Sequence, residues 1–378
     1  MRLAVVTETF PPEINGVSLT IGQLVSRLSA RGHDVQVICP HQDGFQQQDD
    51  VSDGLFLTKG YPIPFYPGLK FGAPEIGRLK RFWQEQRPDV VQIVTEGPLG
   101  WAAIRAARAL EIPMVSDYHT HFDAYSAHYG FSIVKPILFR YLKWFHNQTE
   151  TTLVPTTQLL NTLQQQGYDH LHVVGRGIDT QKFGPQHRSA SLRSQWDASE
   201  LVLLYVGRIA PEKNIDLAVS AYHHIKEAIP GTKFVLVGDG PARARLQQQF
   251  PSLIFTGSLT GPQLSQHYAS ADMFLFPSMT DTFGNVVLEA MSSGLPVVAY
   301  DGAAARELVQ PGINGFLAPF GDDKAYLAQA VLAAKQLFQL PAMGASARLA
   351  AEKCEWESVV NDLEQILCDV AIGKECHA

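Results

Sequence analysis

Short apolar runs alternate with longer segments of helical periodicity along most of the chain. In the first half, the pattern predicts strands at 2–8, 33–40, 89–97 and 113–119 and helices at 17–32 and 100–112. In the second half, it predicts strands at 201–208, 233–240, 253–258 and 273–278 and helices at 214–228, 242–250, 262–271 and 285–294. Continuous Val, Ile and Leu runs between helices indicate parallel sheets covered on both faces. We therefore predict an α/β fold with two doubly wound, Rossmann-like domains.

The polar, turn-rich stretch at 177–196 is the best candidate for a domain boundary. A chain of 378 residues suits two domains of about 150–200 residues each. We place the N-terminal domain at 1–185 and the C-terminal domain at 186–355. The last helical stretch, within 356–378, could cross back to the N-terminal domain. Because ligands of doubly wound folds bind at the carboxyl ends of the strands, we expect the ligand in a cleft between the two domains.

Composition narrows the class of protein. Hydrophobic residues make up 46% of the chain and charged residues 18%, which is typical of a globular protein. The net charge of −7 argues against a global attraction to nucleic acid. No segment reaches the roughly 18–20 apolar residues of a transmembrane helix, and residues 1–10 lack a signal-peptide cleavage site. Four cysteines without zinc or CxxC spacing indicate reduced thiols and a cytoplasmic chain: Cys39, Cys354, Cys368 and Cys376.

Residues 276–302 place two acids on either side of a glycine, where a strand ends and a helix begins. The first N–H groups of a helix have no intrahelical partner and favour anions or hydroxyls. Asp281 precedes the helix and Glu289 lies within it, so they would reach different parts of one extended ligand. Gly284 lets a ligand approach the backbone. Carboxylates can hold the hydroxyls of a ribose or hexose; the alternative is an N-cap aspartate and a solvated glutamate.

A second candidate is the sequence YVGRIAPEKN at 205–214. A strand leads to Gly207 and Arg208, and Lys213 follows on the same loop. Two cations at the carboxyl edge of a sheet suit a diphosphate. The alternative is a surface loop whose cations pair with Glu212 and its neighbours.

Gly16 closes a turn that enters the first helix, where backbone N–H groups could meet a phosphate. The sequence around it is neither GxGxxG nor a Walker loop, and most glycines in such a position only close a turn.

His119, His121 and Asp123 alternate after a predicted strand. Such a set could form an open metal site. Because no further ligand cluster is visible in the sequence, we favour a histidine that hydrogen-bonds the substrate and expect no metal. The alternative is a histidine whose hydrogen bonds are satisfied within the wall of the cleft.

The segment 131–147 carries Lys135, Arg140 and Lys143, without an acid, among aromatic and aliphatic residues. A basic amphipathic helix can lie on an anionic membrane surface. Pro136 lies within the segment, and burial in the core is the alternative.

Taken together, the motifs resemble the retaining glycosyltransferases of the GT-B fold, of the large family with the E-x7-E motif. The resemblance runs along nearly the whole chain, and the ordered set is far more specific than any one motif. It rests on ETFPPEINGVS (8–18), DYHTHFD (117–123), RGIDTQKFGP (176–185), VGRIAPEKN (206–214), LVGDGP (236–241) and TDTFGNVVLEAMSSGLPVVA (280–299). It implies two Rossmann-like domains, with the acceptor on the N-terminal one and the nucleotide-sugar donor on the C-terminal one.

The resemblance also implies roles for single residues. Arg208 and Lys213 would bind the donor diphosphate, Glu289 the ribose and Asp281 the transferred sugar. Asp281 stands where the family usually has glutamate, which predicts an altered sugar fit. The implied catalytic residues are His119, Arg208, Lys213 and Asp281. The implied donor-binding residues are Gly16, Gly207, Arg208, Lys213, Asp281, Phe283, Gly284, Asn285 and Glu289.

The implied activity is transfer of a hexose, with retention and without a metal or other cofactor. GDP-mannose is the favoured donor, and a lipid-linked or glycan hydroxyl is the favoured acceptor. Peripheral contact with the inner face of an anionic membrane, through 131–147, is an open expectation. Alternatives are a non-hydrolysing nucleotide-sugar epimerase, glucosyl transfer from a UDP-sugar, and a non-catalytic nucleotide-sugar sensor.

Overall fold

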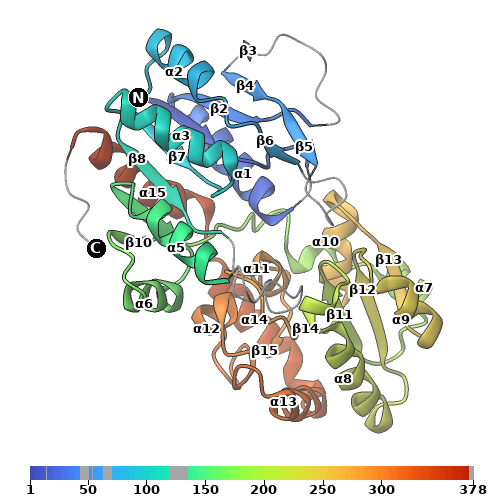
Figure 1. The fold of residues 1–378 in the computed structure, drawn as a ribbon. Helices are drawn as coiled ribbons and strands as arrows, with labels where there is room; N and C mark the ends of the chain where they lie inside the picture. The colour runs from blue at the N-terminus through green and yellow to red at the C-terminus, as the bar shows by residue number, and fades with distance from the viewer. Residues whose placement is uncertain (14, 43–50, 53, 63–69, 120–134, 374–378) are drawn as a thin grey trace. The chain divides into compact units, whose positions relative to one another are not determined.

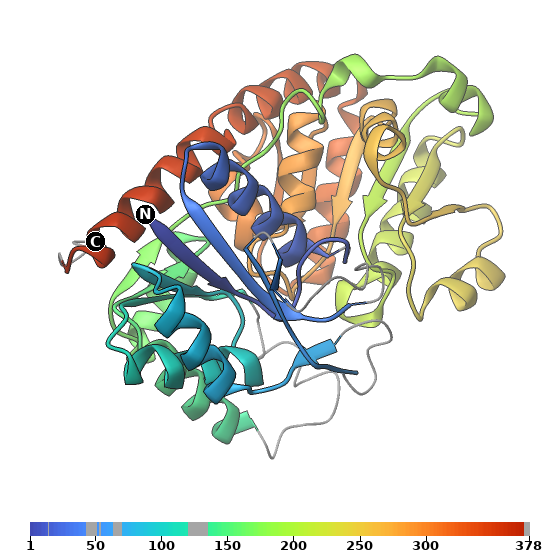
Figure 2. The same ribbon diagram turned by 90° about the horizontal axis from the view of Figure 1, so that it is seen from above.

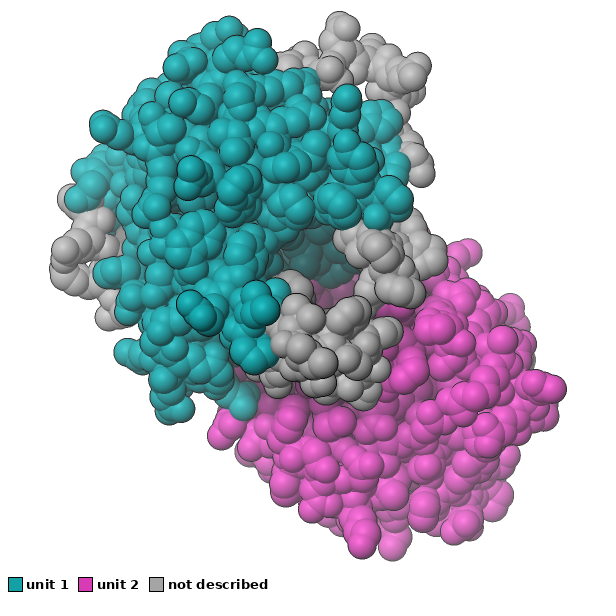
Figure 3. All heavy atoms as spheres, in the orientation of Figure 1, with its two compact units in different colours: residues 1–120, 133–175, 357–378 teal, residues 121–132, 176–356 magenta. Residues whose placement is uncertain are grey.

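The structure is a computed structural model that describes residues 1–13, 15–42, 51–52, 54–62, 70–119 and 135–373. Contacts between Cα atoms divide the chain into two compact units, coloured separately in Figure 3. Unit 1 comprises residues 1–120, 133–175 and 357–378, and unit 2 comprises residues 121–132 and 176–356.

Unit 1 contains an eight-stranded sheet in which all neighbouring strands are parallel except the pair at one edge (Figure 1). β1 has β2 on one side and β7 on the other, so the direction of winding reverses between β1 and β7. A separate antiparallel hairpin is formed by β5 (Gly60–Pro62) and β6 (Lys70–Gly72). The order across the sheet is β10 (Leu171–Val173), β9 (Thr151–Val154), β8 (Met114–Asp117), β7 (Val90–Ile93), β1 (Arg2–Val6), β2 (Asp34–Pro40), β4 (Leu55–Thr58) and β3 (Val51–Ser52).

Helices cover the unit 1 sheet, and their ends follow simple capping rules. The side chain of Asn15 accepts a hydrogen bond from the Ser18 N–H at the start of α1, and Pro98 occupies the first turn of α3. Ala4 and Val6 of β1 join the core beneath α2 and α3. The helices are α1 (Gly16–Ala30), α2 (Ile76–Glu85), α3 (Pro98–Ala109), α5 (Lys135–His146), α6 (Thr157–Gln165) and α15 (Trp356–Ala371).

α15 belongs to unit 1 from residue 357 onward, although it lies at the far end of the sequence. Arg31, which follows α1, donates to the carboxylates of Glu357 and Glu364. His33 Nε2 lies 2.7 Å from Glu364 Oε1. The hydrogen bond from His33, followed by that from Arg31, lowers the pKa of Glu364. Figure 2 shows α15, in dark red, beside the blue N-terminal strand and helix.

α5 presents two different faces. Leu142, Phe145 and His146 are buried, whereas Ile137 is 69% exposed and its basic neighbours Arg140 and Lys143 also face solvent. Pro136 is the second helical residue, a position where the missing N–H costs no intrahelical bond. Among the described residues, no helix is long and apolar enough to cross a bilayer.

Unit 2 contains a six-stranded, fully parallel sheet. β11 lies between β12 and β14, so the winding of this sheet reverses between β11 and β14. The order is β13 (Ile254–Gly257), β12 (Lys233–Val237), β11 (Val202–Val206), β14 (Met273–Phe276), β15 (Val297–Tyr300) and β16 (Gly315–Ala318).

The two faces of the unit 2 sheet bury separate cores. Leu203 and Tyr205 point into the core formed with α8, α9 and α13. Leu204 and Val206 point into the core formed with α10, α11, α12 and α14. This alternation is what a strand buried on both faces requires. The unit 2 helices are α7 (Ala190–Gln195), α8 (Ile215–Ala228), α9 (Arg243–Gln249), α10 (Gly261–Ser270), α11 (Asn285–Ser292), α12 (Ala303–Leu308), α13 (Asp323–Lys335) and α14 (Leu340–Ala351).

The chain passes from unit 1 to unit 2 at residues 175–176, upstream of the boundary expected at 185–186. The segment after this point packs on unit 2. The Ile178 N–H donates to the Cys354 carbonyl at 2.9 Å, and the Phe183 ring lies in the core beneath α11.

Candidate functional site

Most predicted donor-side residues follow β11 and β14, the two strands between which the unit 2 sheet reverses. Gly207 follows β11 with a φ of +147°, in the region that favours glycine. The backbone then passes Arg208 and forms the short 3-10 helix Pro211–Lys213. Asp281 lies in the loop between β14 and α11. The fold therefore brings the cations and the first acid of the pattern to one edge of the sheet.

Arg208 is held by a buried acid. Its Nη1 lies 3.3 Å from Glu212 Oε1, and the Glu212 side chain is only 1% exposed. The guanidinium itself stays partly open to solvent, with 36% of the side chain exposed. The Tyr205 hydroxyl donates to the Arg208 carbonyl at 3.0 Å, which fixes the backbone of the same residue. Arg208 therefore pairs with Glu212, as the alternative interpretation of the sequence proposed. This contact from the buried side orients the guanidinium.

Lys213 and Asp281 form an ion pair across the same switch point. The Lys213 Nζ lies 2.9 Å from Asp281 Oδ2, and the Ser278 hydroxyl donates to that same oxygen. Both charged side chains are largely buried. The sequence predicted a role for each residue but not their contact.

α11 begins in the way the sequence predicted. Gly284 adopts a φ of +86° immediately before Asn285, the first residue of α11. A β-carbon on Gly284 would lie 3.0 Å from the Phe276 ring, so a side chain there would be crowded as well as strained. Phe283 is buried, and its carbonyl accepts from the Ala304 N–H at 2.8 Å. Phe283 therefore supports the turn from within the core.

Glu289 points into a polar contact with α10. Its Oε2 accepts from the Tyr268 hydroxyl at 2.8 Å. Burial raises the pKa of the Glu289 carboxyl, although the hydrogen bond from Tyr268 and the charge of Lys182 oppose that shift. No pattern in the sequence pointed to Tyr268 as the partner of Glu289.

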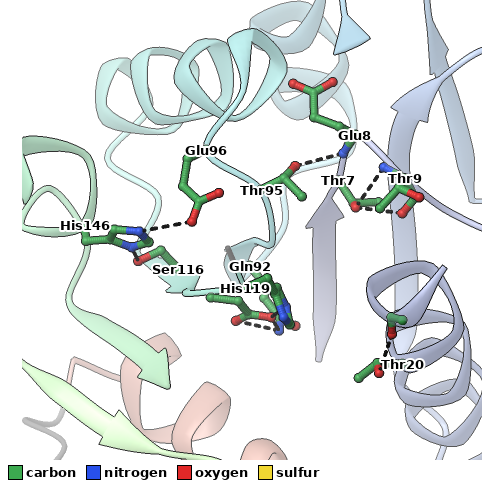
Figure 4. Close-up of polar contacts among 12 residues, drawn as sticks. Thr7, Glu8, Thr9, Thr20, Gln92, Thr95, Glu96, Ser116, His119 and His146 are labelled. Atoms are coloured by element: carbon green, nitrogen blue, oxygen red, sulfur yellow. Dashed lines mark hydrogen bonds and ion pairs between the residues drawn. The ribbon is translucent and has the colours of Figure 1, made fainter. Parts of the chain in front are cut away.

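The unit 1 candidates lie at the carboxyl edge of the unit 1 sheet. Gly16 is the first residue of α1, and its carbonyl accepts from the Thr20 hydroxyl at 2.7 Å. His119 follows β8, and its Nε2 lies 3.3 Å from Asp117 Oδ2. Figure 4 shows His119 next to Gln92, with dashed lines marking the polar contacts of this group. His121 and Asp123 lie outside the described residues.

A nearby cluster has the composition of a nucleophile, a base and an acid. Ser116 Oγ lies 2.9 Å from His146 Nδ1, and His146 Nε2 lies 3.4 Å from Glu96 Oε1 (Figure 4). Ser116 is fully buried and also contacts the Thr149 and Thr152 hydroxyls. A nucleophile must be reached by its substrate, so the buried Ser116 lacks the access that a catalytic serine needs. Within the described residues, no three His, Cys, Asp or Glu side chains are grouped to hold a metal ion.

Two doubly wound sheets, with glycine turns and with paired cations and carboxylates at the switch point of the unit 2 sheet, are typical of α/β proteins that bind nucleotide-type ligands.

Comparison with known proteins places the chain within that class. A model described as Glycosyltransferase Family 4 matches residues 14–182, and one described as Glycosyl transferases group 1 matches residues 200–336. A GDP-mannose-dependent alpha-mannosyltransferase of Mycobacterium tuberculosis is 34% identical over 88% of this chain and 87% of its own length. An alpha-monoglucosyldiacylglycerol synthase of Streptococcus pneumoniae is 27% identical over 84% of this chain and 75% of its own. The chain therefore belongs to the glycosyltransferase family that these models and relatives represent, and it is a glycosyltransferase.

A solved structure of a sucrose-phosphate synthase from Thermosynechococcus elongatus matches the fold. Its TM-score is 0.80 at 18% identity, with 99% of this chain and all of the other covered. At that identity the likeness concerns the fold alone. The fold is GT-B, as the sequence motifs predicted.

Proposed function

We propose that this glycosyltransferase moves a hexose, with mannose favoured, from a nucleoside diphosphate sugar to a hydroxyl of a lipid-linked or glycan acceptor. The observation that carries the proposal is the pair of cations Arg208 and Lys213 on one loop at a switch point of the unit 2 sheet. A diphosphate leaving group needs positive charge at that edge. The name of the M. tuberculosis relative supports GDP-mannose as the donor.

The ion pair of Lys213 and Asp281 suggests how donor binding is coupled to sugar contact. A diphosphate that approaches Lys213 competes with the Asp281 carboxylate for the same ammonium group. Release of Asp281 would make its oxygens available to the hydroxyls of the transferred sugar. Glu289, on the same helix that Gly284 caps, is the proposed contact for the ribose.

The proposed reaction retains the configuration at the anomeric carbon. The bond from that carbon to the diphosphate breaks, and the charge of the leaving group is taken up by Arg208, Lys213 and the N–H groups at the start of α11. The acceptor oxygen then bonds to the same face, and its proton passes to the leaving phosphate oxygen. His119 is proposed to hydrogen-bond the reacting sugar. We propose that no metal takes part, because the two cations and the helix start supply the positive charge.

A lipid-linked acceptor is supported by α5 in unit 1. Ile137, Arg140 and Lys143 are exposed on this helix, and such a basic amphipathic face is suited to an anionic lipid surface. The name of the S. pneumoniae relative specifies a monoglucosyldiacylglycerol product, which also favours a lipid acceptor. We propose peripheral contact with the inner face of a membrane through this helix.

A panel of sugar nucleotides tests the proposal. The purified chain is incubated with GDP-, UDP- and ADP-linked hexoses, with and without vesicles of anionic phospholipid and diacylglycerol or a glycan acceptor. Released nucleotide and the glycoside product are both measured. GDP-mannose is expected to give transfer to an added acceptor. A sugar isomer formed without an acceptor would indicate an epimerase, and no turnover with any donor would indicate a sensor.

A further inference from the structure

A buried chain of three polar side chains leads to His119 at the carboxyl edge of the unit 1 sheet. Gln92, on β7, donates from Nε2 to both carboxylate oxygens of Asp117, at 3.1 Å to Oδ1 and 2.9 Å to Oδ2. Asp117 ends β8, and its Oδ2 lies 3.3 Å from His119 Nε2. Gln92 is 2% exposed, and the side chains of Asp117 and His119 are 6% and 5% exposed. Figure 4 shows the labelled residues Gln92 and His119 close together.

The chemistry of these groups fixes the direction of each hydrogen bond. An ionised carboxylate only accepts, and beside such a carboxylate the Nε2 of His119 carries the proton that it shares with Asp117. In the neutral imidazole, Nδ1 is then the acceptor nitrogen. The amide of Gln92 contacts both oxygens, so the Asp117 carboxylate cannot rotate without losing one of these bonds. Gln92 therefore holds Asp117, and Asp117 holds the tautomer and the ring plane of His119.

Stability alone does not explain this arrangement. A buried carboxylate with two polar partners that carry no fixed charge contributes less to folding than apolar side chains of the same volume. β7 and β8 are neighbouring central strands, where apolar side chains would pack without that cost. The three residues also lie beside the switch point between β1 and β7, where ligands of doubly wound sheets bind.

We infer that Gln92 and Asp117 are positioning residues of the transfer reaction, which hold the imidazole of His119 in one tautomer and orientation toward the reacting sugar. The inference rests on the proposed function, in which His119 contacts that sugar. It assigns a role to two residues that the sequence motifs left without one.

The first test compares Asp117→Ala, Asp117→Asn and Gln92→Met with the wild-type chain. Turnover is measured at saturating donor and acceptor. Asp117→Ala is expected to lower kcat about 10- to 100-fold, as the loss of a group that orients a functional histidine does. Asp117→Asn keeps an acceptor oxygen, so its kcat should lie above that of Asp117→Ala. The kcat of Gln92→Met should lie between that of the Asp117 variants and that of wild type. The KM for the donor should change less than about twofold, because the donor diphosphate contacts other residues.

A double-mutant cycle with His119→Ala separates positioning from a general loss of structure. If Asp117 acts through His119, the double variant should match His119→Ala alone within about a factor of two. Losses that multiply in the double variant would overturn the inference while leaving the role of His119 intact. An unchanged kcat in His119→Ala would instead overturn the proposed contact of His119 with the sugar. Absence of transfer by the wild-type chain would overturn the proposed function itself.

Gln36→Met is the matched control. Gln36 is a buried glutamine of the same sheet, on β2, and its Nε2 donates to the Gln86 carbonyl at 3.1 Å rather than to Asp117. Gln36→Met should lower the melting temperature about as much as Gln92→Met does but leave kcat unchanged. An equal fall of kcat in both variants would show that buried glutamines matter only for packing, and the inference would be wrong.

Discussion

Each of the two cations on the β11 loop has a carboxylate partner, but the partners differ in burial. Glu212 is almost fully buried beneath Arg208, whereas Asp281 is 23% exposed beside Lys213. Asp281 can therefore be hydrated when Lys213 turns to a phosphate, whereas Glu212 would be left buried without Arg208. At the scale of single residues, Lys213 is the cation best placed to change partners.

Lys213→Ala is expected to lower kcat by about 10²–10³, because a preorganised charge would be missing where negative charge develops. Lys233→Ala is the matched control. Lys233, the first residue of β12, also forms an ion pair, at 3.0 Å to the exposed Asp197. Initial rates at saturating donor and acceptor provide the comparison. Equal rates for wild type and Lys213→Ala would refute the assignment of Lys213.

The sequence placed the candidate site residues on their strands, loops and helices, but it did not predict their contacts. Gly207, Gly284 and Asp281 stand where a strand ends and a helix begins, and local spacing carries that information. The partners Tyr268 and Gln92 come from other elements and lie in no motif. Only the packing of helices on sheets brings them to Glu289 and Asp117.

At the scale of elements, Glu8 joins three segments of unit 1. Its backbone N–H donates to Thr95 Oγ1 at 2.8 Å, just after β7. Its carboxylate accepts from the N–H of Gly72 on β6 and from that of Leu99 on α3. Burial raises the pKa of Glu8 to about 7, and the two backbone hydrogen bonds oppose the rise. The end of β1 is therefore tied to β6 and α3 by a carboxyl group that titrates near neutrality.

Glu8→Gln should flatten the dependence of stability on pH. In the folded chain Glu8 keeps its proton up to about pH 7, whereas in the unfolded chain it loses it near 4.5. The folded state therefore binds more protons between these values, and stability falls as pH rises, by at most about 1.4 kcal/mol per pH unit. Urea denaturation at pH 5, 6 and 7 measures the slope. Identical slopes for the variant and wild type would contradict this account of Glu8.

Elements that were long or strongly periodic were predicted correctly from the sequence. The helices at 17–32 and 214–228 appear as α1 and α8, and every strand predicted in the second half is present. The hairpin of β5 and β6 was missed because strands of three residues carry too little alternation to be recognised.

At the scale of the whole molecule, the proposed reaction should not need a metal. EDTA treatment followed by dialysis is expected to leave the transfer rate unchanged, because Arg208, Lys213 and the start of α11 supply the positive charge. The rate is measured before treatment, after it, and after addition of Mg²⁺ or Mn²⁺. A large loss that a divalent cation restores would instead favour a metal site and draw attention to His121 and Asp123.

The arrangement of the units along the chain bears on the order in which they form. Unit 2 is complete at residue 356, but unit 1 still lacks α15 at that point of synthesis. Val360, Leu363 and Leu367 of α15 are buried, so the surface that they cover in unit 1 is open to water until the ribosome has made them. Unit 1 is therefore synthesised before unit 2 but completes its fold after it. In newly made chains, unit 1 would need protection by chaperones for longer than unit 2.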